Sequence, residues 1–356
     1  MTVYIMLYFF IFVVTFIVKL TGRTTDKRRN KLCFAIFGAI LLVIGLRHSS
    51  MGNDLPGYIE TFNLSKIFSF KQLYLFCEKY YEFGFIVFIK LCGTILPNET
   101  WYLLACAAFS IIPVAVFVAK KKVDPLLAAL IYTGLPSFAM LYSALRQSIA
   151  FGLCLLSLKF VEEKKPVKFV LMIAFTALFH RSALIFMVCY PAYWVYLNRK
   201  NRLYLFPVVI IVYILRKALF SLVAPFFGTS YLDMYESNSF GILFFLCALY
   251  LFEIFFMDYR SKEQNGYANI LYLACICQTF ASVSTVAMRI TEYFALILII
   301  LLPRTITSQI RSSKNKLIFY IVFSFGFILI GLMFLYEGRN NWSMSYPYHW
   351  FWEKIT

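Results

Sequence analysis

The sequence contains few charged residues. Only 14% of its 356 residues are Asp, Glu, Lys or Arg, whereas 62% are hydrophobic. A soluble domain typically has about 25% charged and about 45–50% apolar residues, so this composition excludes an ordinary soluble protein. Length alone would suggest two or three soluble domains, but the long apolar runs indicate a single membrane domain instead.

Acidic residues are the scarcer of the two charge types. The chain has 17 Asp and Glu against 34 Lys and Arg, which gives a net charge of +17. In a soluble chain this excess would suggest nucleic acid. Here the basic residues lie mostly in short clusters between apolar runs, as in the cytoplasmic loops of membrane proteins. We therefore expect a lipid bilayer as partner, and no nucleic acid.

Residues that bind metals or nucleotides are also sparse. The three histidines, His48, His180 and His349, lie far apart, and the nine cysteines have no metal-binding spacing. We interpret the cysteines as small apolar residues. No glycine-rich phosphate loop of the G-x-x-x-x-G-K-[ST] type is present. The sequence therefore predicts no metal site, no cofactor and no nucleotide-sugar donor.

Apolar runs predict about twelve transmembrane helices, since one span needs about 20 residues. The candidate spans are 2–20, 32–46, 100–119, 125–142, 144–161, 168–180, 183–197, 203–224, 241–257, 267–286, 290–303 and 317–335. The pair 168–180 and 183–197 is short and broken around His180. The first run lacks a preceding basic segment and a cleavage site, which favours a span over a signal peptide. The predicted fold class is an all-α polytopic membrane protein, with residues 1–335 as one transmembrane domain.

Basic clusters orient these spans. They follow the first, third, fifth, seventh, ninth and eleventh spans, at 23–31, 120–122, 164–168, 199–202, 260–262 and 304–316. Because cytoplasmic loops carry the excess of Lys and Arg, both termini should lie outside.

Two segments are predicted to lie on the outer face. Residues 83–97 are apolar but short and contain Lys90, so we interpret them as an interfacial or re-entrant helix that closes an outer segment over 47–99. Residues 336–356 form an outer tail rich in Trp and Tyr, which suits an interfacial belt or a sugar-binding platform.

Polar residues gather at the outer ends of the predicted spans. They are Arg47, Asp54, Glu82, Arg146, Gln147, His180, Arg181, Arg289 and Glu292. An ionisable residue at a helix centre costs about 2.5–3.5 kcal/mol and usually faces a cavity or a partner. Snorkelling to the interface explains each residue singly, and an i, i+3 ion pair explains Arg289 with Glu292. Because all of these residues are predicted to lie at the outer face, together they indicate a functional site there.

This combination of residue types suits transfer from a lipid pyrophosphate. Arginine presents a donor fork that fits phosphate oxygens, so we expect the clamp to comprise Arg47, Arg146, Arg181 and Arg289. A sugar hydroxyl needs a proton acceptor. His180 interrupts an apolar run and ranks first, because histidine changes charge near neutral pH. Glu82 ranks second, since the start of an interfacial helix should be solvated. Asp54 is the third candidate and suits ordering its loop or binding acceptor hydroxyls.

Several of these residues lie in short motifs that resemble those of the EpsG family. In chain order they are Arg47 followed by Gly52-x-Asp54-x-x-x-Tyr58, Glu82-x-Gly84, Arg146-Gln147-x-x-Ala150, Phe179-His180-x-Ser182-Ala183 and Arg289-x-x-Glu292-Tyr293. The resemblance runs from about residue 47 to residue 293, and it departs at Phe83, where a proline is expected. EpsG-family proteins are similar to Wzy-type polymerases of bacterial surface polysaccharides.

The resemblance implies a fold and an activity. The fold is a C-type glycosyltransferase architecture in the bacterial cytoplasmic (inner) membrane. The activity is the joining of undecaprenyl-pyrophosphate-linked oligosaccharide repeat units at the outer face, in O-antigen, capsule or exopolysaccharide synthesis. Tyr58, Gln147, Glu292 and Tyr293 would support the site, Glu292 as the partner of Arg289. A chain-length regulator is a further partner that this activity would admit.

Two other functions stay open at this point. One is a different glycosyltransferase with a lipid-linked donor, such as an O-antigen ligase. A ligase typically carries a large outer loop late in the chain, whereas the predicted outer loop over 225–240 is small. The other is a transporter of lipid-linked oligosaccharides, which usually shows related halves with sites at the midplane. The sequence shows one-sided polarity and no evident repeat.

Overall fold

The computed structural model describes residues 1–20, 25–223, 240–310, 312–339 and 343–354. It is 80% helical, and within these ranges the only extended pairing is an isolated antiparallel bridge between Arg47 and Trp350. The all-α prediction is therefore confirmed. The predicted outer loop over 225–240 lies, apart from Phe240, outside the described residues, as do 340–342 and 355–356 of the predicted tail.

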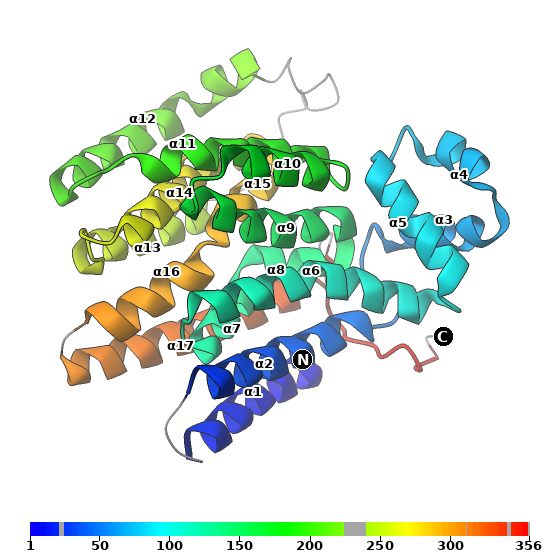
Figure 1. The fold of residues 1–356 in the computed structure, drawn as a ribbon, viewed down its shortest axis with the longest axis horizontal. Coiled ribbons are helices and arrows are strands. Elements are labelled where there is room, and N and C mark those ends of the chain that lie inside the picture. The colour runs from blue at the N-terminus through cyan, green and yellow to red at the C-terminus, as the bar shows by residue number, and fades with distance from the viewer. Residues whose placement is uncertain (21–24, 224–239, 311, 340–342, 355–356) are drawn as a thin grey trace.

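The helices follow one another as bundle helices joined by short connections (Figure 1). They are α1 (Thr2–Leu20), α2 (Asp26–Gly45), α3 (Leu55–Ile67), α4 (Phe70–Cys77), α5 (Phe83–Ile95), α6 (Glu99–Lys121), α7 (Pro125–Gly134), α8 (Pro136–Ser143), α9 (Leu145–Glu162), α10 (Pro166–Ala177), the 3₁₀ helix η1 (Arg181–Val188), α11 (Cys189–Trp194), α12 (Arg199–Val223), α13 (Phe240–Phe256), α14 (Lys262–Thr279), α15 (Thr285–Ala295), α16 (Leu298–Arg304), the π-helix η4 (Thr305–Gln309) and α17 (Ser313–Glu337).

Four described helices are long and apolar enough to cross a membrane: α1, α6, α12 and α17. The number rises to six if each of two bent pairs is one span, namely α7 with α8, bent by 65°, and the pair at 285–307, bent by 43°. These helices support a multi-pass membrane protein. They do not confirm the count of about twelve spans, because other predicted spans correspond to short helices, such as α10 and α13, or to helices with polar ends.

The break predicted at His180 is present. α10 ends at Ala177, and η1 begins at Arg181. His180 itself is extended, with φ −157° and ψ 117°. The chain therefore turns at this residue, and the two predicted spans on either side of it are not one continuous helix.

The core is made by helices that other helices enclose. All ten residues of α7 are buried, and its N-terminus is capped by Asp124, whose side chain accepts a hydrogen bond from the Leu127 amide at 3.0 Å. By contrast, large apolar side chains on α1 and α12 are exposed, including Phe9 at 70% and Ile214 at 67%. Exposed apolar surface of this extent suits contact with lipid rather than water.

The predicted outer segment over 47–99 is a small helical layer of its own. α3, α4 and α5 lie together at one end of the bundle, near the C-terminus (Figure 1). Phe62 of α3 stacks on Tyr102 of α6, with ring centroids 4.7 Å apart. Lys90 of α5 donates hydrogen bonds of 2.7 Å to the carbonyl oxygens of Ser65 and Phe68 at the end of α3. A cation at a helix C-terminus is favourable, so Lys90 ties α5 to α3.

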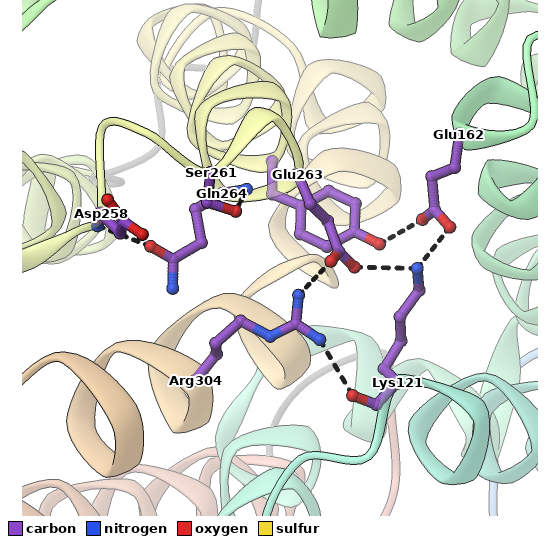
Figure 2. A network of polar contacts seen from close by, with 8 residues as sticks. Lys121, Glu162, Asp258, Ser261, Glu263, Gln264 and Arg304 are labelled. Atoms are coloured by element: carbon purple, nitrogen blue, oxygen red, sulfur yellow. Dashed lines mark hydrogen bonds and ion pairs between the residues drawn. The ribbon is translucent and has the colours of Figure 1, made fainter.

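The opposite end of the bundle holds a compact ion network (Figure 2). Lys121, at the end of α6, pairs with Glu162 and with Glu263, and Arg304 pairs with Glu263 as well. These contacts join helix ends that belong to the predicted cytoplasmic clusters. α9 runs between the two ends, since Arg146 and Glu162 are separated along its axis by about 24 Å at about 1.5 Å per residue.

Candidate active site

Six of the sequence-predicted site residues line one cavity. Its volume is 640 Å³, and its wall includes Glu82, Arg146, Gln147, His180, Arg181 and Arg289. These residues come from the connection before α5, the start of α9, the break between α10 and η1, and α15. The cavity therefore collects segments that are up to two hundred residues apart in the chain.

Glu82 is the residue that joins these segments. One carboxylate oxygen lies 3.2 Å from Nδ1 of His180 and accepts a hydrogen bond of 3.1 Å from the Arg181 amide. The other oxygen forms an ion pair with Arg146. The Glu82 side chain is only 10% exposed, so the prediction that it is solvated is wrong. Packing of α5 against the end of α10 removes it from water.

The electrostatics of Glu82 fix the protonation of its partner. Burial alone would raise the pKa of Glu82, but the His180 hydrogen bond and the Arg146 charge outweigh burial and lower the pKa to about 2. At neutral pH the carboxylate therefore has no proton to donate. Nδ1 of His180 must carry the hydrogen in this contact, which leaves Nε2 as the nitrogen with a lone pair when the ring is neutral.

Arg146 is positioned on three sides. Its Nε donates to the Tyr58 hydroxyl at 3.2 Å, and its guanidinium lies over the Tyr81 ring, 4.9 Å from the centroid. Together with the Glu82 ion pair, these contacts hold the guanidinium in one orientation at the cavity wall. Tyr58 therefore supports the site from behind, as the resemblance implied, whereas Tyr81 was not singled out from the sequence.

Gly84 explains how Glu82 reaches His180. A Cβ at Gly84 would lie 2.9 Å from the Leu178 carbonyl oxygen. The adjacent Phe85 amide donates to this same oxygen at 3.1 Å. The start of α5 thus packs directly on the end of α10, an approach that only glycine permits. The Glu82-x-Gly84 motif therefore combines a functional side chain with the contact that positions it.

Arg47 lies outside this cavity, in contrast to its predicted place in the clamp. It is buried, with 1% of its surface exposed. Its guanidinium donates to the carbonyl oxygens of Ile44, Met51, Leu141 and Tyr142. The N–H groups of the guanidinium are therefore engaged by four backbone carbonyl oxygens. The geometry favours a structural role, in which Arg47 fastens the end of α2 to the end of α8.

Gly52 completes that junction. Its φ of +131° is unfavourable for other residues, and a Cβ there would lie 2.1 Å from the Tyr142 carbonyl oxygen. The next residue, Asn53, donates its amide to the Ser143 hydroxyl at 2.8 Å. Asp54 is exposed and precedes α3, and it is absent from the cavity wall. The Gly52-x-Asp54 motif thus shapes the loop that leads to Tyr58.

Glu292 and Tyr293 lie behind the cavity wall. The buried carboxylate of Glu292 accepts a hydrogen bond of 2.9 Å from the Ser137 amide, at the N-terminus of α8. It forms no ion pair with Arg289 in the described part of the chain, so that prediction is wrong. Tyr293 lies 2.9 Å, oxygen to oxygen, from the Ser182 hydroxyl on the cavity wall.

Further charged or polar residues line the cavity beside the Glu82 cluster, among them Glu78, Lys79, Gln147, Arg181 and Arg289. Arg181 and Arg289 were predicted, whereas Lys79 was not. Gln147 donates to the Arg289 carbonyl oxygen at 3.1 Å and links α9 to α15. The run Glu78-Lys79-Tyr80-Tyr81-Glu82 in the sequence was the available signal for Lys79. Besides the Glu82–Arg146 pair, the wall carries three cationic side chains and the carboxylate of Glu78, and guanidinium and ammonium groups beside open volume suit an anion.

Comparison with known proteins places these motifs in one family. The model of the EpsG family matches residues 30–350, nearly the whole chain. The chain belongs to the EpsG family. EpsG-family proteins are Wzy-type polysaccharide polymerases, so membership indicates a polysaccharide polymerase of the glycosyltransferase type. No curated protein and no solved structure matches this EpsG-family chain.

Proposed function

We propose that this protein joins oligosaccharide repeat units linked to undecaprenyl pyrophosphate, at the outer face of the bacterial cytoplasmic membrane. The observation that carries the proposal is the contact of His180 with Glu82, beside Arg146, in a cavity that Arg181 and Arg289 also line. A base held by a carboxylate, next to guanidinium groups that line the same wall, suits attack by a hydroxyl on a carbon that bears an anionic leaving group.

The reaction forms one bond and breaks one bond. The hydroxyl oxygen of the acceptor sugar attacks the anomeric carbon of the donor, while the bond from that carbon to the pyrophosphate oxygen breaks. The hydroxyl proton passes to Nε2 of His180, and the pyrophosphate leaves with the bonding electron pair. Glu82 keeps Nδ1 protonated and stabilises the imidazolium that forms, so it acts as a positioning residue.

Arg181 and Arg289 are our candidates for the leaving-group clamp. Both line the cavity, and the Arg181 amide is held by Glu82 at 3.1 Å, which fixes the backbone next to His180. Charge on the pyrophosphate increases as the bond breaks, so guanidinium groups nearby stabilise the transition state more than the ground state. Arg146 contributes mainly by orienting Glu82.

The charge distribution supports an outward-facing site. The basic helix ends that gather around Lys121 lie at the opposite end of α9 from Arg146. Basic loops mark the cytoplasmic side, so a cavity at the other end faces outside. A C-type glycosyltransferase architecture and the inner membrane location belong to the same proposal.

The test uses the full-length protein in vesicles with a purified lipid-linked repeat unit. We expect a ladder of lipid-linked oligomers, which gel electrophoresis or mass spectrometry resolves. Failure of active, folded protein to make any product longer than one unit would overturn the proposal. Transfer of a single unit to an acceptor without a lipid pyrophosphate would favour a ligase instead.

A further inference from the structure

A second cavity lies at the same end of the molecule as the candidate active site. Its volume is 460 Å³, and its wall comes from the loop after α2, from α3, from the start of α6 and from the C-terminal tail. The residues that define its chemistry are His48, Asn63, Lys66, Glu99, Thr100 and Phe351. An imidazole, an amide, a carboxylate, an ammonium and a hydroxyl therefore converge beside an aromatic ring. Arg47 also lines the wall, but its guanidinium donates to backbone carbonyl oxygens.

The tail is fixed at this cavity by backbone pairing. Arg47 and Trp350 form the isolated bridge, the His48 amide donates to the His349 carbonyl oxygen at 2.8 Å, and the Phe351 amide donates to the Leu46 carbonyl oxygen at 3.0 Å. Pairing on both sides of Trp350 sets the position of the next ring. Phe351 is therefore held on the cavity wall although its side chain is 43% exposed.

Exposed aromatic surface continues beyond Phe351. Trp352 is 60% exposed, stacks on Trp350 with centroids 4.9 Å apart, and contacts Phe351 edge to face at 4.8 Å. A rigid aromatic surface next to hydrogen-bonding groups suits a ligand with one apolar and one polar side. Sugar rings have this character, since their C–H faces are apolar and their edges carry hydroxyls.

The polar groups of the second cavity can form further hydrogen bonds with a ligand. Asn63 donates to Glu99 at 3.1 Å, and Lys66 donates to the Pro97 carbonyl oxygen at 2.9 Å. The amide, the carboxylate and the ammonium each have further hydrogen-bond donors or acceptors besides the one that takes part in these bonds. The Ser50 amide donates to Nδ1 of His48 at 3.1 Å, so Nε2 carries the hydrogen and is a donor. Mixed donors and acceptors suit hydroxyl groups better than a phosphate.

The helix α3 has residues near both cavities. Tyr58, near the start of this helix, contacts Arg146 of the first cavity. Asn63 and Lys66 of the second cavity follow on the same helix, about 7–12 Å further along its axis. An extended oligosaccharide with its reacting end in the first cavity would therefore reach the second.

We infer that the second cavity binds a distal part of the growing glycan and retains the product between additions, an inference that rests on the proposed polymerase function. It assigns the aromatic tail a role as a sugar platform. Retention should affect how many units are added before the product dissociates. It should leave the joining of two single repeat units largely unchanged, because that first step takes place at the first cavity before a longer product exists to be retained.

Two variants test this inference in the full-length protein. Asn63→Leu removes the amide, and Phe351→Ala removes the ring. Phe76→Ala is the matched control, because Phe76 is 49% exposed on α4 and lines neither cavity. One measurement is the binding of free oligosaccharides, several repeat units long, released from the bacterium's own surface polysaccharide. The others are product length and the rate of the first joining step. Detergent-extracted protein level and thermal unfolding check folding.

We expect both variants to weaken oligosaccharide binding by about 2- to 10-fold, the range for one lost hydrogen bond or contact. Both should shorten the products, while the first joining step and the control stay within about twofold of wild type. Unchanged binding and product length in both folded variants would overturn the inference. If the wild-type protein joins no units but binds oligosaccharide through Asn63 and Phe351, the polymerase proposal fails and the sugar site stands.

Discussion

Two polar clusters occupy the two ends of the bundle, and they differ in charge balance. At one end, Lys121 and Arg304 meet Glu162 and Glu263, so two cations face two carboxylates. The Tyr267 hydroxyl also donates a hydrogen bond to Glu162. At the other end, Glu82 is shared by Arg146 and His180, while Arg181 and Arg289 line the same cavity.

This difference distinguishes a junction between helices from a candidate functional site. The balanced cluster satisfies its own charges and joins the ends of α6, α9, α14 and α16. The cavity wall has more cations than carboxylates and includes the His180 ring, which contacts Glu82. Several cationic side chains beside open volume suit the binding of an anion. Paired charge without surplus indicates a junction between helices.

The largest effect should follow from removing the base. His180→Gln should lower the polymerisation rate by about 10²–10⁴-fold, because a positioned general base typically contributes this factor. The measurement is ladder formation from lipid-linked repeat units, with protein level and substrate binding recorded in parallel. His349→Gln is the matched control, since His349 also contacts a carboxylate, Glu353, at 2.9 Å but lies outside the cavity. Near-normal activity of His180→Gln would make His180 a structural residue.

The two arginines proposed as the leaving-group clamp give the next test. Arg181→Lys and Arg289→Lys retain charge but lose the donor fork. Loss of a hydrogen bond to a charged group costs about 1.5–3 kcal/mol, so we expect turnover to fall by about 10- to 100-fold. Arg199→Lys, at the opposite end of the molecule, where Arg199 stacks over Phe255 at 4.4 Å, is the control. Wild-type rates in both cavity variants would remove the clamp from the mechanism.

Glu82 sharpens the comparison through pH. The pKa of Glu82 in the folded protein is about 2, below its usual value. The ionised carboxylate therefore stabilises the fold at pH values above the usual pKa, and this stabilisation is lost as the pH falls through the folded pKa. Glu82 therefore stays ionised at neutral pH. Glu82→Gln should lower the rate by roughly tenfold and move the acid limb of the pH–rate profile to lower pH, because the imidazolium loses its counter-charge. An unshifted profile would argue against the His180 contact.

The balanced cluster should respond in stability rather than in chemistry. Glu263→Gln leaves Lys121 and Arg304 without one of their carboxylates. Partly buried charged hydrogen bonds are worth about 1–3 kcal/mol, so thermal unfolding in detergent should occur at lower temperature. Turnover per folded molecule should stay within about twofold. A selective loss of turnover without a change in unfolding would contradict the structural role.

Asp54 provides the smallest expected effect. It is exposed and absent from the cavity wall, and surface substitutions usually change free energies by about 0.5 kcal/mol or less. Asp54→Asn should therefore keep the polymerisation rate within about twofold of wild type. A loss comparable to that of His180→Gln would reinstate Asp54 as a proton acceptor and would require the loop at 47–58 to move toward the cavity.

The amino-acid sequence by itself determined the helical class and the boundaries of several helices. Apolar runs bounded by charged clusters correspond closely to α1, α6, α9, α13 and α17, because burying backbone groups in an apolar environment requires helices. The polar residues at one set of helix ends also identified six residues of the cavity wall. The number of spans was harder to predict from the sequence. A short apolar helix such as α10 and a bent pair such as α7 with α8 have the same apolar composition as a single straight span.

Only the tertiary structure decided which polar residue contacts which. Arg47 and Arg146 look alike in sequence, yet backbone carbonyls at the end of α8 enclose the first, whereas the second meets Glu82 at the cavity. Glu82 looked solvated until the contact of Gly84 with Leu178 placed it against His180, 98 residues away. The reason is physical: hydropathy sets how deep a residue lies along its helix, but its neighbours depend on which helix faces pack together.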